Sequence, residues 1–244
     1  MILRLLVSLI YVMIKRIIYR INAVIARRSS NAYCKWLMDR GVQIGGGTYI
    51  YPNNTLIDVS RPSLVTIGSN CFMNQHFTLL THDWVAKVFL GSGRSFLNSS
   101  GRVKIGDNVS FGQNVMVLKG VTIGDNCFIG AGSIVTHDIP SNSVAVGSPC
   151  RVIMTIEDYY QKRLHCSEKE ALEYAKSIQD RFHRKPKLEE MREEFIWFVS
   201  GNEVDKYPMI PIKSQLGTTY NTFVAYHKAK YKNFEEFLAA AGVK

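Results

Sequence analysis

The chain has 244 residues, of which 46% are hydrophobic and 20% are charged, so it is long enough and apolar enough to bury a core without disulfide bonds. This composition excludes a disordered chain, and 18 glycines and 7 prolines are too few for a collagen-like or low-complexity sequence. Of the net charge of +10, residues 1–30 supply +6, with no Asp or Glu, so the charge does not by itself indicate nucleic-acid binding.

The apolar N-terminal segment, residues 1–28, contains charged residues at intervals too short for a membrane-spanning helix. Its longest uncharged stretch, from Leu5 to Ile14, is half of the roughly 20 residues that a spanning helix needs. No small-residue cleavage site follows, which argues against a signal peptide. The next ten residues, 31–40, predict a short helix that ends at Gly41.

Helical spacing predicts an amphipathic helix over residues 1–28. One side carries Arg4, Ser8, Arg16, Arg20 and Arg27, and the other side carries Leu3, Leu6, Ile10, Ile14, Ile17, Ile21 and Ile25. A cationic helix of this kind can lie in an anionic membrane surface. The alternative is that its apolar face packs against other subunits or against the C-terminal region.

The cysteines and histidines indicate neither a disulfide framework nor a metal site. The five cysteines are odd in number and include no C-x-x-C pair. The six histidines show no H-E-x-x-H or similar spacing, so no metal is expected. Reduced thiols favour a cytoplasmic location, with peripheral contact at the inner face of the membrane if residues 1–28 bind lipid.

A six-residue repeat begins at Ile105 and continues without interruption. It reads IGDNVS, FGQNVM, VLKGVT, IGDNCF, IGAGSI and VTHDIP. Apolar or small residues fill the first and fifth positions of each unit, with Gly, Asn and Asp between them. Poorer copies start at Ile44 (IGGGTY, IYPNNT, LIDVSR) and, after an offset, at Ile67 (IGSNCF, MNQHFT, LLTHDW).

This period predicts a parallel β-helix, a mainly β fold. Each unit supplies a short strand and a turn, and the first-position side chains stack on their equivalents in the next coil. Gly, Asn and Asp tolerate the positive φ angles that tight turns need. Cys71 and Cys127 fall in inward positions and are expected in the core.

The stretch GVTIGDNCFIGAGSIVTHDIPSNSVAVGSPCRVI, residues 120–153, resembles the end of the repeat in maltose, galactoside and polysaccharide O-acetyltransferases. Over roughly residues 42–156 the chain is thus similar to the hexapeptide-repeat acyltransferases. The resemblance, and not the spacing, implies a left-handed β-helix with three faces, a homotrimer, and acetyl-CoA bound in the cleft between neighbouring subunits.

His82 stands where a long insertion leaves the repeat, and loops on a rigid scaffold commonly carry sites. Acetyl transfer to an alcohol requires a base, and an imidazole suits that role near neutral pH. In the similar family, a His at the base of this loop is the general base, and the triplet THD matches it at His82. Asp83 is expected to orient His82, to contact the acceptor, or only to shape the turn.

The resemblance also suggests coenzyme and acceptor contacts. On the later coils the candidates for acetyl-CoA are Gly112, Gln113, Gly130, Ala131, Thr136, His137 and Arg151. His137 stands where the family often has Lys, which weakens one phosphate contact or makes it pH-dependent. Arg151 suits phosphate because guanidinium binds it well. Asn74 and His76, one unit before His82, are candidates for the acceptor or are solvated turn residues.

Three regions are expected: an N-terminal helical region (1–41), the hexapeptide-repeat catalytic domain (42–156) and a helical C-terminal region (157–244). In the last region we expect helices over IEDYYQKRL, over SEKEALEYAKSIQDRFHR with Ser167 as its cap, over LEEMREEFIWFVSG ending at Gly201, and near NFEEFLAAAG. The many aromatic residues there stack on sugars or, more simply, form a helical core.

These features predict an acetyl-CoA-dependent O-acetyltransferase acting on a carbohydrate, such as a capsule, O-antigen or exopolysaccharide unit that is free or lipid-linked. One alternative is N-acetylation of a nucleotide-linked amino sugar. Another is a small acceptor with a hydroxyl, and a third is a non-catalytic β-helix scaffold.

Overall fold

The computed structural model describes the backbone of residues 2–244 and the side chains of residues 11–244. The side-chain positions expected for Leu3, Arg4, Leu6, Ser8 and Ile10 lie outside the described residues. The chain divides into two compact units, Met1–Tyr159 and Tyr160–Lys244.

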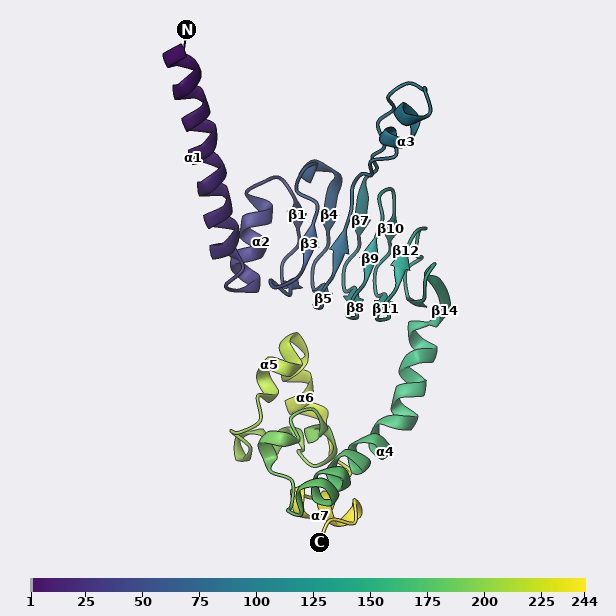
Figure 1. The fold of residues 1–244 in the computed structure, drawn as a ribbon. Helices are drawn as coiled ribbons and strands as arrows, with labels where there is room; N and C mark the ends of the chain where they lie inside the picture. The colour runs from purple at the N-terminus through teal and green to yellow at the C-terminus, as the bar shows by residue number, and fades with distance from the viewer. Residues whose placement is uncertain (1) are drawn as a thin grey trace. The chain divides into compact units, whose positions relative to one another are not determined.

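The first unit is built on three sheets whose strands alternate along the chain (Figure 1). Sheet A contains β1 (Gln43–Ile44), β4 (Val65–Ile67), β7 (Val103–Ile105) and β10 (Thr122–Ile123). Sheet B contains β2 (Tyr49–Ile50), β5 (Phe72–Met73), β8 (Ser110–Phe111), β11 (Phe128–Ile129), β13 (Ser143–Val146) and β14 (Arg151–Thr155). Sheet C contains β3 (Leu56–Ile57), β6 (Thr78–Leu79), β9 (Met116–Val117) and β12 (Ile134–Val135).

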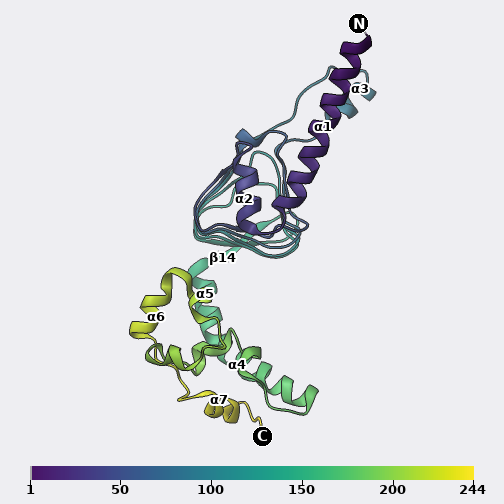
Figure 2. The same ribbon diagram turned by 90° about the vertical axis from the view of Figure 1, so that its left-hand side faces the viewer.

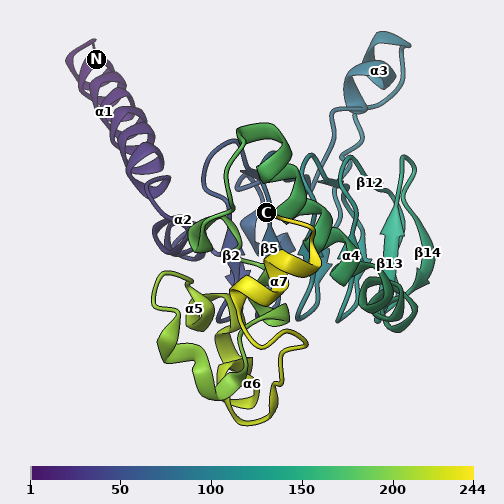
Figure 3. The same ribbon diagram turned by 90° about the horizontal axis from the view of Figure 1, so that it is seen from below.

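Because successive strands pass from sheet A to B to C and back to A, the chain winds as a three-sided parallel β-helix. From β1 to β13, strands within each sheet pair in parallel, and the coils lie over one another when viewed along the axis of the β-helix in Figure 2. Among the strands that the structure describes, β13 and β14 are the one antiparallel pair, at the end of sheet B (Figure 3). The prediction of a mainly β fold therefore describes residues 43–155, whereas the regions on either side are helical.

The core of the β-helix contains the predicted inward positions of the repeat. The first positions, Ile105, Phe111, Val117, Ile123, Ile129 and Val135, are each at most 1% exposed. The fifth positions, Val109, Val115, Val121, Cys127, Ser133 and Ile139, are also buried. All five cysteines are free, and Cys71 and Cys127 lie in this core as expected.

The corners between sheets use residues in the left-handed conformation. At the corner from sheet A to sheet B, Asn70, Asn108, Asn126 and Asn142 have φ between +54° and +61°. Their side chains stack, since the Asn108 amide donates to Asn126 over 2.9 Å and the Asn126 amide donates to Asn142 over 3.0 Å. Each coil thus aligns the next through side-chain as well as backbone hydrogen bonds.

Two helices precede the first coil. Helix α1 spans Ile2–Ala26 and α2 spans Ser30–Met38, with the Ser29 side chain accepting from the Ala32 N–H at the start of α2. Tyr33, Cys34 and Leu37 of α2 join the β-helix core and close its N-terminal end. Among the described residues, no helix combines the length and apolar character required to cross a bilayer.

The second unit has a separate helical core. It contains most of α4 (Ile156–Phe182), then α5 (Ile212–Leu216), α6 (Tyr220–Tyr226) and α7 (Phe234–Ala240), with 3₁₀ turns between them. Its core includes Phe195, Phe198 and Phe237. The aromatic residues of this region therefore contribute largely to packing.

Two expectations for this region are wrong. Ser167 does not begin a helix, because α4 continues through it from Ile156 to Phe182. The predicted helix over LEEMREEFIWFVSG is instead two short 3₁₀ turns, Leu188–Glu190 and Glu194–Trp197. Phe195, Phe198 and Val199 are all buried here, and this packing overrides helical propensity. The last expected helix is present as α7, capped by Asn233.

Candidate active site

His82 lies at the neck of the insertion, three residues after β6 ends at Leu79. The two sides of the neck pair as a short antiparallel ladder, with a bridge between His82 and Ser100. The Asp83 N–H donates to the Ser99 carbonyl over 3.2 Å, and the Gly101 N–H donates to the Thr81 carbonyl over 3.0 Å. Beyond the neck, the insertion forms the short helix α3 (Ala86–Gly91) (Figure 1). The rigid coil and this ladder together fix the backbone that carries the imidazole.

The His82 imidazole is hydrogen-bonded to Asp58, which follows β3 in the preceding coil. His82 Nδ1 lies 2.6 Å from Asp58 Oδ2. Strand β3 pairs with β6, and the Asp58 N–H donates to the Leu79 carbonyl over 3.0 Å, so the coil stacking itself places the carboxylate beside residue 82. The side chains are 22% exposed for His82 and 8% exposed for Asp58. The imidazole is thus reachable from solvent while its partner is buried.

Asp58 has hydrogen-bond donors on both carboxylate oxygens. Oδ1 accepts from the Ser60 N–H over 2.9 Å and from the Ser60 hydroxyl over 2.6 Å. Oδ2 accepts from the Thr81 hydroxyl and, over 3.2 Å, from the Thr81 N–H, in addition to His82. Burial raises the pKa of Asp58, but the hydrogen bonds from Ser60, Thr81 and His82 outweigh it and hold that pKa below its usual range. Asp58 is therefore ionised at neutral pH.

An ionised Asp58 fixes the tautomer of His82. A carboxylate only accepts, so Nδ1 carries the hydrogen and Nε2 of the neutral ring carries the lone pair. Within residues 11–244, whose side chains are described, no group is hydrogen-bonded to Nε2. Trp84, which is 66% exposed, lies edge-on to the imidazole at 6.4 Å between ring centroids. The ring thus has a basic nitrogen that is free to accept a proton.

Asp83 does not orient His82 in this structure, because Asp58 occupies that role. Instead, Asp83 Oδ2 lies 2.7 Å from the Lys119 ammonium and accepts from the Ser99 hydroxyl over 2.9 Å, while Oδ1 accepts from the Val85 N–H. The Lys119 contact is the main reason that the pKa of Asp83 is lowered to about 2. Lys119 also donates to the Ser99 hydroxyl, so it ties together both sides of the insertion neck.

The expected coenzyme residues fall at two corners of the β-helix. Gly112, Gln113, Gly130 and Ala131 lie at the corner from sheet B to sheet C, after β8 and β11. Thr136 and His137 follow β12 at the corner from sheet C to sheet A, the same corner as His82, and the Thr136 hydroxyl lies 2.8 Å from His137 Nδ1. Arg151 begins β14 and is exposed. A single chain therefore does not bring all of them together.

The glycines at the corner from B to C are required by coil packing. A Cβ on Gly112 would lie 2.5 Å from the Ala131 nitrogen and 2.8 Å from its Cα. A Cβ on Gly130 would lie 2.6 Å from a methyl carbon of Val146. The coil geometry alone explains both residues, so neither glycine by itself points to a bound ligand.

Asn74 and His76 also lie at the corner from sheet B to sheet C, at the opposite end of β6 from His82. His76 has φ of +61°, in the same turn position as Asn54, Asn114 and Gly132 of the other coils. The Asn74 side chain accepts from the Gln75 N–H over 2.8 Å. These two residues shape the turn, and within a single chain they are not beside the imidazole.

Sequence reasoning missed Asp58 and Lys119. Asp58 sits in the poor repeat copy LIDVSR, and one signal was available: it ends a sheet-C unit, as does the His82 region one coil later. No cluster of His, Cys, Asp and Glu among the described residues could hold a metal ion. Burial raises the pKa values of Cys71, Cys127 and Cys150, so these thiols are poor nucleophiles.

Comparison with known proteins identifies the repeat. Residues 102–137 match the family of the bacterial transferase hexapeptide (six repeats). These residues carry the hexapeptide repeat, and the chain is similar to acetyltransferases over little more than half of the length of the first curated relatives that it matches. It is 44% identical over 126 residues to galactoside O-acetyltransferase of Escherichia coli strain K12, a match that covers 50% of this chain and 59% of that relative.

Two solved structures are also similar to parts of the chain. A maltose O-acetyltransferase from Clostridium difficile 630 is 28% identical, with 56% of this chain and 83% of that chain covered and a TM-score of 0.39. The polySia-specific acetyltransferase NeuO is 31% identical, with 46% of this chain and 48% of that chain covered and a TM-score of 0.35.

Proposed function

We propose that this chain is an acetyl-CoA-dependent O-acetyltransferase of a carbohydrate hydroxyl, with His82 as general base and Asp58 as the residue that positions it. The observation that carries the proposal is the 2.6 Å contact between His82 Nδ1 and Asp58, which leaves Nε2 available at the insertion neck. The resemblance to sugar O-acetyltransferases supports the reaction class and the left-handed coil.

The chemistry follows from this geometry. As the acceptor hydroxyl attacks the thioester carbonyl, its proton moves to His82 Nε2, and Asp58 stabilises the imidazolium that forms. The tetrahedral intermediate then collapses by breaking its C–S bond. The departing thiolate takes the proton from the imidazolium, which leaves an acetyl ester and free coenzyme A. Asp58 stays ionised throughout.

The distribution of the candidate residues supports a homotrimer. The base lies at the corner from C to A, whereas Gly112, Gln113, Gly130 and Ala131 lie at the other edge of sheet C. The outer face of sheet C between them is largely apolar, formed by Leu56, Thr78, Met116 and Ile134. Packing that face against a second copy would place one protomer's base near the other protomer's coenzyme residues. In that cleft His137 and Arg151 are the proposed contacts for the coenzyme phosphates.

The acceptor we propose is a capsule, O-antigen or exopolysaccharide unit, and this rests on the family resemblance around THD. Asn74 and His76 of the partner corner are the proposed acceptor contacts. A panel of saccharides, nucleotide-linked amino sugars and small alcohols, with mass spectrometry of the product, distinguishes O-acetylation of a sugar from the alternatives.

The test is thiol release from acetyl-CoA by His82→Ala. General-base loss is expected to lower kcat by about 100-fold or more, with acetyl-CoA binding by calorimetry retained. His165→Ala, on the exposed side of α4, is the matched control and should turn over normally. Near-normal turnover by His82→Ala would refute the assignment of the base, and failure of the wild type to bind acetyl-CoA would refute the reaction class.

A further inference from the structure

Helix α1 is attached to the first unit by one side of its last turns. The Tyr19 ring lies 5.9 Å from the Trp36 ring of α2, and the Arg40 guanidinium lies over both rings, 5.1 Å from Tyr19 and 3.6 Å from Trp36. Ala26 is only 5% exposed. Since Tyr19 and Ala26 are seven residues apart, they share one side of the helix, and that side faces α2.

The side of α1 away from this attachment is apolar and exposed. It carries Ile14, Ile17, Ile18, Ile21 and Ile25, which follow the spacing of a single helical face. These five side chains are between 45% and 52% exposed. Leaving a continuous strip of this kind in water is unfavourable, so it indicates a surface that is covered in use.

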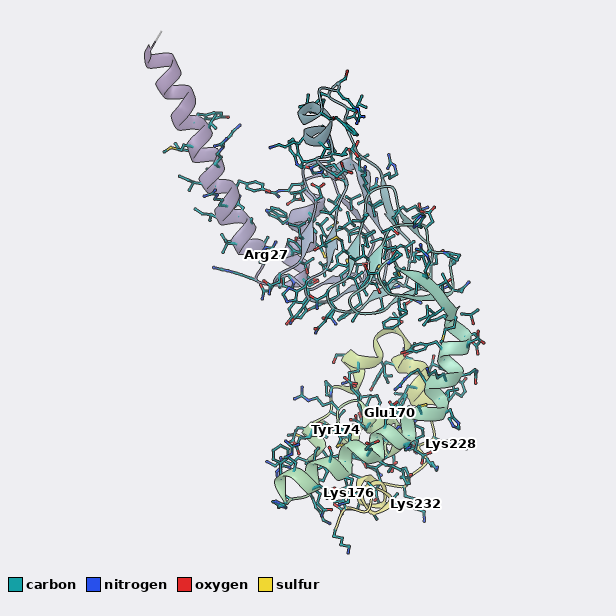
Figure 4. All side chains as sticks on the ribbon, turned by 45° about the vertical axis from the view of Figure 1, so that its right-hand side comes forward. Arg27, Glu170, Tyr174, Lys176, Lys228 and Lys232 are labelled. Atoms are coloured by element: carbon teal, nitrogen blue, oxygen red, sulfur yellow. The ribbon has the colours of Figure 1, made fainter. Side chains whose placement is uncertain are left out.

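Cations lie on the other side of the helix from this strip. Lys15 and Arg16, four and three residues before Tyr19, share its side of the helix by helical spacing, and Arg20 lies beside them. Among the described residues, none of the three forms an ion pair, and residues 1–30 contain no Asp or Glu. Arg27, labelled at the base of α1 in Figure 4, is by contrast engaged with the carbonyl groups of Pro52 and Thr55.

We propose that residues 11–25 dock on the surface of an anionic phospholipid bilayer, with the helix lying along the surface. The isoleucine strip enters the acyl boundary while Lys15, Arg16 and Arg20 reach the lipid phosphates. A second copy of α1 would bring the same unpaired cations together without an acidic partner. An anionic bilayer accommodates both the apolar strip and the long basic side chains, which extend around the helix to the lipid headgroups. This inference does not depend on the proposed acetyl transfer.

Flotation of the full-length protein with vesicles tests the proposal. We expect the wild type to float with vesicles of phosphatidylcholine and phosphatidylglycerol at 7:3, and weakly with phosphatidylcholine alone. I17E/I21E should stay in the bottom fraction with both vesicles. R16Q/R20Q should lower the partition coefficient on the anionic vesicles by about 25-fold, because each basic residue contributes about fivefold.

The matched control removes the same charge from another surface. Lys228 and Lys232, exposed in the second unit and labelled in Figure 4, are changed in K228Q/K232Q, which should float like the wild type. Circular dichroism confirms that each variant is folded. The proposal is overturned if the wild type does not float, or if I17E/I21E floats as well as the wild type. Sedimentation velocity tests whether I17E/I21E loses the native oligomer. If it does, and if the wild type does not bind vesicles, the strip is assigned to contacts between copies of the chain.

Discussion

Asp58 and His82 are 24 residues apart in the sequence, yet the carboxylate of one and the imidazole of the other are 2.6 Å apart. Two stacked coils of the β-helix create this contact, since β3 pairs directly with β6. The pair therefore depends on the register of the coils and not on the part of the insertion beyond its neck. Its consequences for turnover and for stability can be measured separately.

Asp58→Asn should lower kcat by about 10²- to 10⁴-fold while leaving the KM for acetyl-CoA close to its original value. An amide can donate to Nδ1 and so favour the wrong tautomer, and it does not stabilise the imidazolium. Steady-state thiol release measures both constants. Asp107→Asn, at an exposed corner away from His82, is the control and should leave kcat unchanged. A normal kcat for Asp58→Asn would show that the carboxylate has no part in turnover.

The same substitution should change how stability depends on pH. The pKa of Asp58 is lowered in the folded state, so its contribution is fully present above the unfolded-state value of about 3.9 and is lost as the pH falls through the folded value. Urea unfolding at pH 7 should show that Asp58→Asn costs roughly 2 kcal/mol, because charge-assisted hydrogen bonds are lost. Between about pH 5 and pH 3 the wild type should lose more unfolding free energy than the variant. Equal pH slopes would contradict this prediction.

Lys119→Met should loosen the insertion without unfolding the β-helix. The ammonium holds Asp83 and Ser99 on opposite sides of the neck, and an exposed ion pair adds little to overall stability. Trypsin should therefore cleave faster at Lys87 and Arg94, inside the insertion, while the melting temperature changes little. The pKa of Asp83, followed by NMR, should rise from about 2 towards its ordinary range. Lys104→Met on the outside of sheet A is the control.

Gly112→Ala should destabilise the first unit by about 3 kcal/mol. The new Cβ would meet backbone atoms of Ala131 at 2.5 Å and 2.8 Å, and stacked coils cannot move apart locally to admit it. Gly46→Ala is the control, because no heavy atom lies within 4 Å of its Cβ position, and its unfolding free energy should change by less than about 1 kcal/mol. Equal denaturation midpoints for the two variants would argue against tight coil packing at Gly112.

The repeat itself could be predicted from the sequence in considerable detail. Ile105, Phe111 and Ile123 are buried because a period of six residues puts every first position on the inside of a three-sided coil. The caps at Asn233 and the turn at Gly41 follow from local conformational preferences in the same way. These are properties of single residues or of short, regular spacings.

Contacts between irregular coils could not be predicted in this way. Where the repeat is regular, stacked residues such as Asn108 and Asn126 are 18 apart, and the period gives the partner directly. Asp58 and Thr81 are 23 apart, and Ser69 and Asp107 are 38 apart across the insertion. An extra residue or a loop changes the sequence separation of stacked residues by an amount that the six-residue period does not predict. The sequence therefore offers Asp83 as one candidate to orient His82, because it is adjacent, and does not indicate Asp58.

The closure of the β-helix by α2 has a consequence for self-assembly. Side chains from this end bond the first coil, since the Ile50 N–H donates to the Ser30 hydroxyl, the Tyr33 hydroxyl donates to the Thr55 carbonyl, and Arg27 donates to the carbonyl groups of Pro52 and Thr55. An unprotected coil would offer its free N–H and C=O groups as a template for strand addition. A chain shortened to begin after Gly41 would therefore be prone to stack end to end into fibrils. Helix α2 thus prevents end-to-end association of β-helices, in addition to covering apolar side chains of the core.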